Sequence, residues 1–165
     1  MRTIVGQQVS VVAATTVMGR IVRKFGQPIE TPWPELNSGT IQVEQIASQS
    51  VDTLAPLGLN TGRAEAILGL SRAIVEGEIQ LEHCVDPERM IAQLQTIRGI
   101  GPWTAHYFGM RILDWPDAFI AGDLVVRRQL HPMSPKEIEQ HSQAWRPWRA
   151  YAVMHLWNAS GFFNT

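Results

Sequence analysis

The chain has 165 residues, 45% of them hydrophobic and 18% charged, which is typical of one globular domain with a sizeable core and excludes a disordered protein. Its formal net charge of -1 disfavours a large basic face for nucleic acid, although backbone amides at a helix start can still bind phosphate. Cys84 is the only cysteine, which excludes a disulfide framework and a cysteine-ligated iron–sulfur cluster. No apolar run approaches the roughly 18 residues of a membrane span, so we expect a soluble cytoplasmic protein.

Helical periodicity dominates the first half of the chain, and strand-like alternation is hard to find. One helix is predicted over residues 2–25, with basic residues in its last turn and Gly26 as its stop. Residues 27–40 are rich in Pro, Ser, Gly and Asn and are predicted to form a loop. A further helix, capped by a polar residue at its start, is predicted over about 60–76.

In the second half of the chain, N-cap residues and prolines in the first turn predict where helices begin. They are predicted over about 86–96 and 102–113, in a short segment after Asp123, after the Ser134–Glu137 capping box, and over about 147–159. About eight helices and no repeat predict a single all-α domain over residues 1–165. The abrupt, uncapped apolar start suggests that the chain is a fragment of a longer protein.

The turn in "IRGIGPWTAHYF" joins two of the predicted helices as a helix–hairpin–helix. Glycines tolerate positive φ and let another backbone come close. The amides of Gly99, Gly101 and the following turn, up to Thr104, would point outward at a helix start and could bind a DNA phosphate. The alternative is a tight helix connection that binds nothing, because G-x-G alone is a weak signal.

Aromatic and acidic residues follow this turn. Trp103 and Tyr107 are spaced i, i+4 and share a helix face, which indicates either core packing or a ligand box. Asp123 follows Gly122 at the start of a helix, so the simplest interpretation of it is an N-cap.

The last predicted helix carries two sets of side chains. Trp148, Tyr151 and His155 are spaced i, i+3, i+7 and are interpreted as a packing stripe, while Trp157 lies off that stripe and could face a cleft.

Histidines give no sign of a catalytic metal site. His83, His106, His131, His141 and His155 show no ligand spacing, and His83 with Cys84 is too small a cluster.

Four segments together resemble a known family: "IVGQQVS", "LQTIRGIGPWTAHYF", "DAFIAGDLVVRRQL" and "RPWRAYAVMHLW". They are similar, in order and over essentially the whole chain, to the helix–hairpin–helix Gly/Pro-Asp superfamily of DNA glycosylases. Within it the inducible alkylpurine type, 3-methyladenine DNA glycosylase II, is the nearest. The resemblance implies two helical lobes that meet near 113–122 with a cleft between them. The N-terminal β-rich domain of close relatives is absent from this sequence.

The resemblance implies a base-excision repair enzyme that flips an alkylated purine, of the 3-methyladenine or 7-methylguanine type, and hydrolyses its N-glycosidic bond. Asp123 would be catalytic, either by stabilising the oxocarbenium ion or by activating water. Trp103, Tyr107 and Trp157 would form a π-rich base pocket, although Asn158 replaces a usual aromatic. Trp103 also stands where bifunctional relatives carry the lysine nucleophile, so no lyase step is expected.

The resemblance also suggests how DNA is held. Gln7 and Gln8 match the segment that fills the gap left by the flipped base, unless they only form the polar face of a helix. No cofactor is expected to be required, but the carbonyls of Gln95, Ile97 and Ile100 could hold a monovalent cation, Na⁺ or K⁺, at the hairpin. The expected partner is double-stranded DNA, bound by a monomer that is nucleoid-associated if bacterial.

Two other functions fit the same residues. One is a non-catalytic module that binds damaged DNA; a carboxylate at position 123 argues against it. The other is a helical interaction module with no role on nucleic acid.

Overall fold

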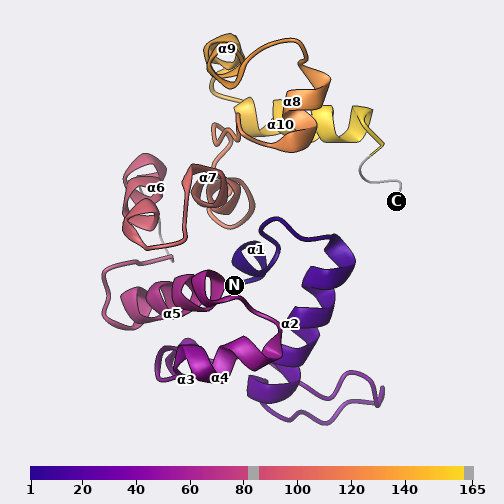
Figure 1. Ribbon diagram of the computed structural model, residues 1–165, viewed down its shortest axis with the longest axis vertical. Helices are drawn as coiled ribbons and strands as arrows, with labels where there is room; N and C mark the ends of the chain where they lie inside the picture. Colours follow the sequence, from indigo (N-terminus) through magenta and orange to yellow (C-terminus); the bar gives the residue numbers. More distant parts are fainter. Residues whose placement is uncertain (82–85, 162–165) are drawn as a thin grey trace. The chain divides into compact units, whose positions relative to one another are not determined.

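The computed structural model describes residues 1–81 and 86–161, and within these ranges the chain is helical (Figure 1). The α-helices are α1 (Arg2–Val5), α2 (Val11–Phe25), α3 (Val43–Ala47), α4 (Val51–Leu54), α5 (Thr61–Val75), α6 (Pro87–Thr96), α7 (Pro102–Arg111), α8 (Leu124–Gln129), α9 (Pro135–His141) and α10 (Arg149–Ala159). Two 3-10 helices, η1 (Ala55–Leu57) and η2 (Ser142–Trp145), and one isolated bridge between Pro28 and Ser38 complete this described part. The predicted all-α class is confirmed, and no described helix has the length and apolar character to cross a bilayer.

The predicted single helix over 2–25 is wrong, because the chain breaks between α1 and α2. Gln8 has a positive φ of 52°, which ends helical propagation. Ser10 then starts α2, since its side chain accepts a hydrogen bond from the amide of Ala13 at 3.2 Å. Residues of both helices are apolar at helical spacing, so the break leaves no mark in the periodicity.

The predicted N-caps of two helices, α5 and α9, are confirmed by the hydrogen bonds of their side chains. Asn60 caps α5 through the amide of Arg63, and Ser134 and Glu137 form the predicted reciprocal capping box of α9. The short helices α3 and α4 were missed, because elements of 5 and 4 residues are too short to show a period.

The described residues divide into two compact units: residues 1–81 with 96–100, and residues 86–95 with 101–161. Residues 113–122, where we expected two lobes to meet, lie within the second unit.

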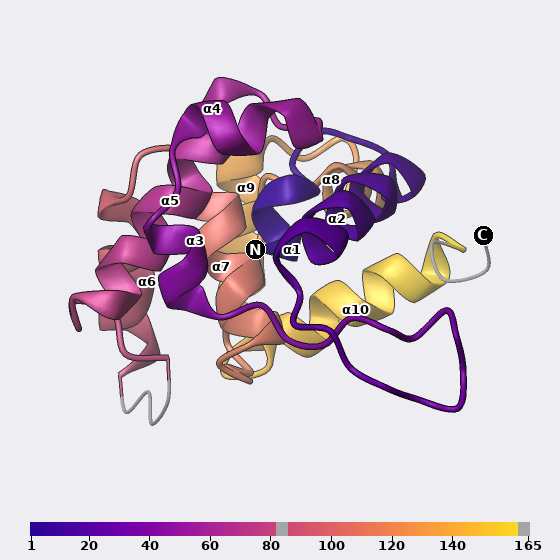
Figure 2. The same ribbon diagram turned by 90° about the horizontal axis from the view of Figure 1, so that it is seen from below.

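In the first unit α5 is the central helix, and α1, α3 and α4 pack against it (Figure 1). Ile67 of α5, Ile46 of α3 and Leu54 of α4 are all buried. The loop between α2 and α3 extends away from these helices (Figure 2).

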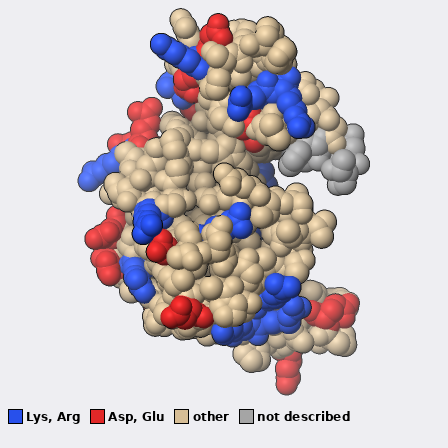
Figure 3. All heavy atoms as spheres, viewed as in Figure 1, with Lys and Arg blue, Asp and Glu red and all other residues tan. Residues whose placement is uncertain are grey.

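On the face drawn in Figure 3 most basic and acidic groups lie singly among uncharged ones, and one larger group of basic side chains gathers near the lower end of the view. On the first unit, Arg98 of the hairpin is 3.3 Å from Glu65, and its side chain is 86% exposed. Such exposed ion pairs contribute about 0–1 kcal/mol to stability.

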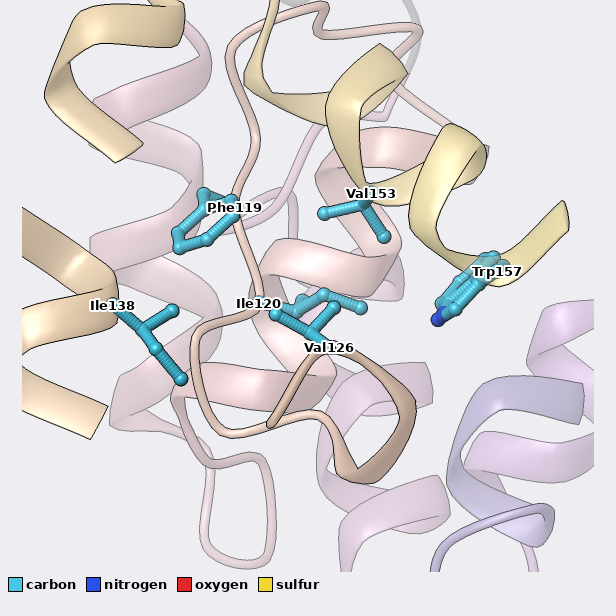
Figure 4. Packing of buried hydrophobic residues seen from close by; sticks show 6 residues of the cluster. All are labelled: Phe119, Ile120, Val126, Ile138, Val153 and Trp157. Carbon is cyan, nitrogen blue, oxygen red and sulfur yellow. The ribbon is translucent and has the colours of Figure 1, made fainter. Parts of the chain in front are cut away.

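The second unit has its own hydrophobic core around α8, α9 and α10 (Figure 4). Its fully enclosed side chains come from these helices and from the segment that precedes α8: Phe119, Ile120, Val126, Ile138, Val153 and Trp157. Trp103 and Tyr107 of α7 pack against this core.

A buried ion pair anchors the segment between α7 and α8. Arg149 and Asp117 are only 3% and 6% exposed. Their contact is bidentate: Nε of the guanidinium donates to Oδ1 at 2.7 Å, and a terminal nitrogen donates to Oδ2 at 2.9 Å. Arg146 adds a contact of 2.9 Å to the same carboxylate. The amide of Ala150 also donates to the carbonyl of Pro116, so the start of α10 holds this segment by backbone and side chain.

His106 holds the same segment from the side of α7. Its Nδ1 accepts a hydrogen bond from the amide of Phe119 at 3.5 Å, and its ring stacks on Trp115. Burial, and secondarily the positive charge of Arg149, lower the pKa of His106 from its ordinary value of 6.5. The neutral imidazole is therefore the form that fits the folded protein.

Replacing Arg149 with Met should destabilise the protein by about 3–5 kcal/mol, because Asp117 then loses its principal partner while remaining buried. Urea unfolding followed by circular dichroism measures this change. Arg111→Met, at an exposed arginine, is the matched control and should change stability by less than about 0.5 kcal/mol. Equal stabilities of the two variants would contradict the anchoring role.

Acidification should destabilise the protein in a manner that depends on His106. Because the folded-state pKa is lowered, the stabilising contribution is complete above pH 6.5 and is lost as the pH falls through the folded-state pKa. Urea unfolding between about pH 7.5 and pH 5 should show a steeper loss for wild type than for His106→Gln, whose amide oxygen can accept the Phe119 amide without titrating. Parallel pH profiles would refute this assignment.

Candidate active site

Asp123 lies at the centre of the candidate site, at the N-cap of α8. Its Oδ1 accepts hydrogen bonds from the amides of Val125 and Val126 at 3.0 and 3.1 Å, which confirms the predicted N-cap. The indole nitrogen of Trp157 donates to the same oxygen at 3.0 Å, and that of Trp103 donates to Oδ2 at 3.2 Å.

Four N–H donors therefore surround one carboxylate that is only 9% exposed. Burying a carboxylate is costly unless its oxygens are hydrogen-bonded, and two backbone amides at a helix start together with two indoles supply those bonds. The site thus places a fixed acceptor group, partly shielded from water, among aromatic rings. The N-cap role and a chemical role are compatible, because the cap occupies Oδ1 alone.

Two of the three rings predicted to form a base pocket, those of Trp103 and Trp157, bind this carboxylate, and the ring of Tyr107 lies beside both of them. Trp103 and Tyr107 are stacked with ring centroids 5.1 Å apart and planes 14° apart, and Tyr107 lies 6.2 Å from Trp157 at a tilt of 42°. Trp103 and Tyr107 are half-buried, whereas Trp157 is only 5% exposed and offers little ring surface to a ligand. A base pocket made by the three rings remains a prediction. The edge contacts of both tryptophans with Asp123 could not be predicted, because i, i+4 spacing gives no information on contacts between helices.

The predicted packing stripe on α10 is wrong. Trp148 and Tyr151 are 58% and 56% exposed and contact each other edge to face, and His155 is exposed too. The buried stripe of α10 instead follows Ala150, Val153 and Trp157. The exposed and the buried residues of α10 both have the spacing i, i+3, i+7. Periodicity therefore predicted the helix, but it could not predict which face packs against the core.

The hairpin between α6 and α7 has two glycines with different structural roles. Gly99 has a φ of +89°, and a Cβ there would lie 2.9 Å from the Cβ of Ala66, so packing against α5 is enough to explain this glycine. Gly101 has a φ of −86°, and a Cβ there would meet nothing within 4 Å. The fold does not require a glycine at position 101.

The hairpin amides remain available to a ligand. Within the part of the chain that the structure describes, the amides of Gly99 and Gly101 make no hydrogen bond, and no side chain caps α7. The side chain of Thr104 is buried, so any contact from this residue would come from its backbone. Amides without a protein partner at an uncapped helix start suit an anion, and phosphate binding at this turn stays a prediction.

Gln7 and Gln8 have different surroundings in the bend between α1 and α2. The side chain of Gln7 donates to the carbonyl of Gly99 at 3.0 Å, and the backbone carbonyl of Gln7 accepts from Arg63. Gln8 is exposed on a left-handed backbone. Gln7 therefore connects the bend to the hairpin, while Gln8 is the one that projects; contact with DNA remains a prediction for both.

Among the described residues no group of three or more His, Cys, Asp or Glu side chains could hold a metal ion; His83 and Cys84 lie outside those residues. Of the carbonyls expected to bind a monovalent cation, those of Gln95, Ile97 and Ile100, the Ile97 oxygen accepts the Ile100 amide at 3.0 Å. A carbonyl has a second lone pair, so this bond does not prevent cation binding.

The chain is similar to known proteins in both sequence and fold. Residues 1–147 match the model of the "HhH-GPD superfamily base excision DNA repair protein". The chain is 33% identical over 161 residues to DNA-3-methyladenine glycosylase 2 of Escherichia coli K12, covering 98% of this chain and 56% of that protein. It therefore spans little more than half the length of this relative.

Solved structures show the same fold. A 3-methyladenine DNA glycosylase from Archaeoglobus fulgidus superposes with a TM-score of 0.77 at 27% identity, over 98% of this chain and 57% of that one. The Clostridium acetobutylicum 8-oxoguanine glycosylase/lyase, in complex with double-stranded DNA, superposes with a TM-score of 0.84 over 99% and 59%; at 17% identity it shows the fold alone. With a family match that covers most of its length, and with the helix–hairpin–helix followed by a capping aspartate, this chain belongs to the HhH-GPD superfamily of base-excision DNA repair proteins.

Proposed function

We propose that this protein is a DNA glycosylase that hydrolyses the N-glycosidic bond of alkylated purines after base flipping. The observation that carries the proposal is the buried carboxylate of Asp123, which four N–H donors hold beside the rings of Trp103 and Tyr107. A protein that only binds DNA has no need of a buried acid next to the sugar–phosphate. The named relatives, 3-methyladenine glycosylases, supply the substrate class.

In this reaction the bond between C1′ of the sugar and the purine nitrogen breaks, and its electron pair stays with the base. An alkylated purine carries a positive charge, so it leaves as a neutral base without needing a strong acid. The sugar acquires oxocarbenium character, which a fixed negative charge stabilises more than it stabilises the neutral sugar. Water then adds to C1′ and gives up a proton, leaving an abasic site. Asp123 either stabilises the cation or also accepts this proton.

The rings of Trp103 and Tyr107 would select the base by charge and stacking. A cationic purine against an aromatic face gains about 0.5–2 kcal/mol per ring. Such a pocket recognises no particular hydrogen-bonding edge, so the substrate range should be broad. Asn158, where alkylpurine enzymes have an aromatic residue, is exposed and adds no ring to it.

The same residues favour a monofunctional enzyme. A lyase step needs an amine that attacks C1′, and the chain has only two lysines, Lys24 and Lys136. Lys24 lies in the first unit, where its Nζ donates to the carbonyl of Thr53 at 3.3 Å, and Lys136 lies in the first turn of α9. By the resemblance to the family, Trp103 would stand at the position of the nucleophilic lysine of bifunctional relatives.

Binding of double-stranded DNA would use the hairpin amides and Gln8. Phosphate held by the amides of Gly99, Gly101 and the start of α7 needs no basic face, in keeping with the net charge of -1. The exposed, left-handed position of Gln8 suits a side chain that enters the gap left by the flipped base. A monovalent cation on the carbonyls of Gln95, Ile97 and Ile100 would add positive charge at the same hairpin.

Asp123→Asn should reduce base release by about 100-fold or more, because it removes the negative charge facing the developing oxocarbenium ion. Asparagine is also a good N-cap, so α8 should persist. The measurement is release of 3-methyladenine, 7-methylguanine and hypoxanthine from duplex DNA in single turnover.

Asp52→Asn, at an exposed acid in the first turn of α4, is the matched control and should release bases at the wild-type rate. Release by wild type that does not exceed release by Asp123→Asn would leave only the non-catalytic damage-binding module.

Gly101→Val should weaken duplex binding by about 10-fold while costing only about 1 kcal/mol of stability for the poorer N-cap, because the protein has room for this side chain and a closely approaching phosphate does not. Fluorescence anisotropy with labelled duplex measures the affinity. Gly19→Val, at another glycine with nothing within 4 Å, is the control. Unchanged binding by Gly101→Val would favour an interaction module without a role on DNA. Gly99 cannot serve here, since any side chain there clashes with α5.

A further inference from the structure

We infer that Oδ2 of Asp123 is the reactive oxygen and that the indole N–H of Trp103 is the positioning group that aims it at the sugar. The inference rests on the proposed function and deepens it. It gives Trp103 a role beyond the predicted wall of the base pocket.

The two carboxylate oxygens have unequal surroundings. Oδ1 accepts three hydrogen bonds, from the amides of Val125 and Val126 and from the indole of Trp157. Oδ2 accepts one, from Trp103 at 3.2 Å, and no other within the described residues. A carboxylate offers about four lone-pair sites, so three donors leave Oδ1 without capacity while Oδ2 retains room for a further partner. Oδ2 is therefore the oxygen with room to approach a cationic sugar or to accept a proton from water.

The direction of Oδ2 depends on Trp103. The donors to Oδ1 come from α8 and α10, whereas the donor to Oδ2 comes from the second residue of α7. The three donors fix the place of Oδ1, but the plane of the carboxylate can still tilt about that oxygen, and the N–H of Trp103 restrains this tilt at Oδ2. Stacking on Tyr107 in turn restrains the indole.

One side chain thereby serves two parts of the reaction. One face of Trp103 stacks on Tyr107 and its edge donates to the carboxylate, and in the proposed reaction its other face would contact the flipped base. A base that stacks on the ring of Trp103 would therefore also stabilise the orientation of Oδ2. Binding of the base and alignment of the acid are linked through a single indole.

Trp103→Phe separates the two roles, because phenylalanine keeps an aromatic face and removes the N–H. In single-turnover excision of 7-methylguanine, the limiting rate should fall about 10-fold or more, while the enzyme concentration at half-maximal rate changes less than about 3-fold. Trp157→Phe is the matched variant, since it removes an indole donor from the same carboxylate at Oδ1, where two backbone amides remain. It should lose less of the limiting rate than Trp103→Phe.

The same substitution in the Asp123→Asn background shows whether Trp103 acts through Asp123. We expect Trp103→Phe to cause no further loss there, because no carboxylate is left to orient. An equal loss in both backgrounds would overturn the inference, since Trp103 would then act only through stacking or folding. A wild-type limiting rate in Trp103→Phe would also overturn it. If Asp123→Asn itself releases bases at the wild-type rate, the proposed function fails as well.

Discussion

The chemistry proposed for this protein depends on keeping one carboxylate buried at a defined place. Asp123 is 9% exposed, and removing a carboxylate from water is costly unless donors replace the lost solvation. Two amides at the start of α8 and two indoles do so without a lysine or arginine partner at hydrogen-bonding distance among the described residues. Neutral donors leave the negative charge uncompensated, which is the property required to stabilise a cationic sugar.

The rest of the second unit can be understood as support for that carboxylate. The chain reaches α8 through a segment without regular structure, so its position must be fixed by side chains. The buried pair of Arg149 and Asp117, together with His106 on the amide of Phe119, ties this segment to α10 and α7. Buried ion pairs add little net stability compared with apolar packing, but they hold one geometry, and here that geometry leads directly to Asp123.

The residues expected to contact DNA and those expected to do chemistry belong largely to different units. Gln7, Gln8 and Gly99 lie in the first, and Asp123 and the three aromatic rings lie in the second. The hairpin belongs to both, because its turn residues 96–100 pack with the first unit while the helices on either side pack in the second. The glycine at position 99 is required where the turn packs on α5, and the one at position 101 is free of such a constraint.

Local sequence determined much of this protein. N-caps and first-turn prolines correctly marked the starts of α5, α6, α7 and α9, because capping depends only on residues three or four positions apart. The same local chemistry identified Asp123 as an N-cap, and the motif resemblance identified the family.

Tertiary structure alone decided the rest. It broke the first helix at Gln8, and it buried Trp157 of α10 in place of Trp148 and Tyr151. It also brought the indoles of Trp103 and Trp157 to one carboxylate. Contacts between residues far apart in the sequence depend on how helices pack, and the hydrophobic period of a single helix does not indicate which helices lie beside it.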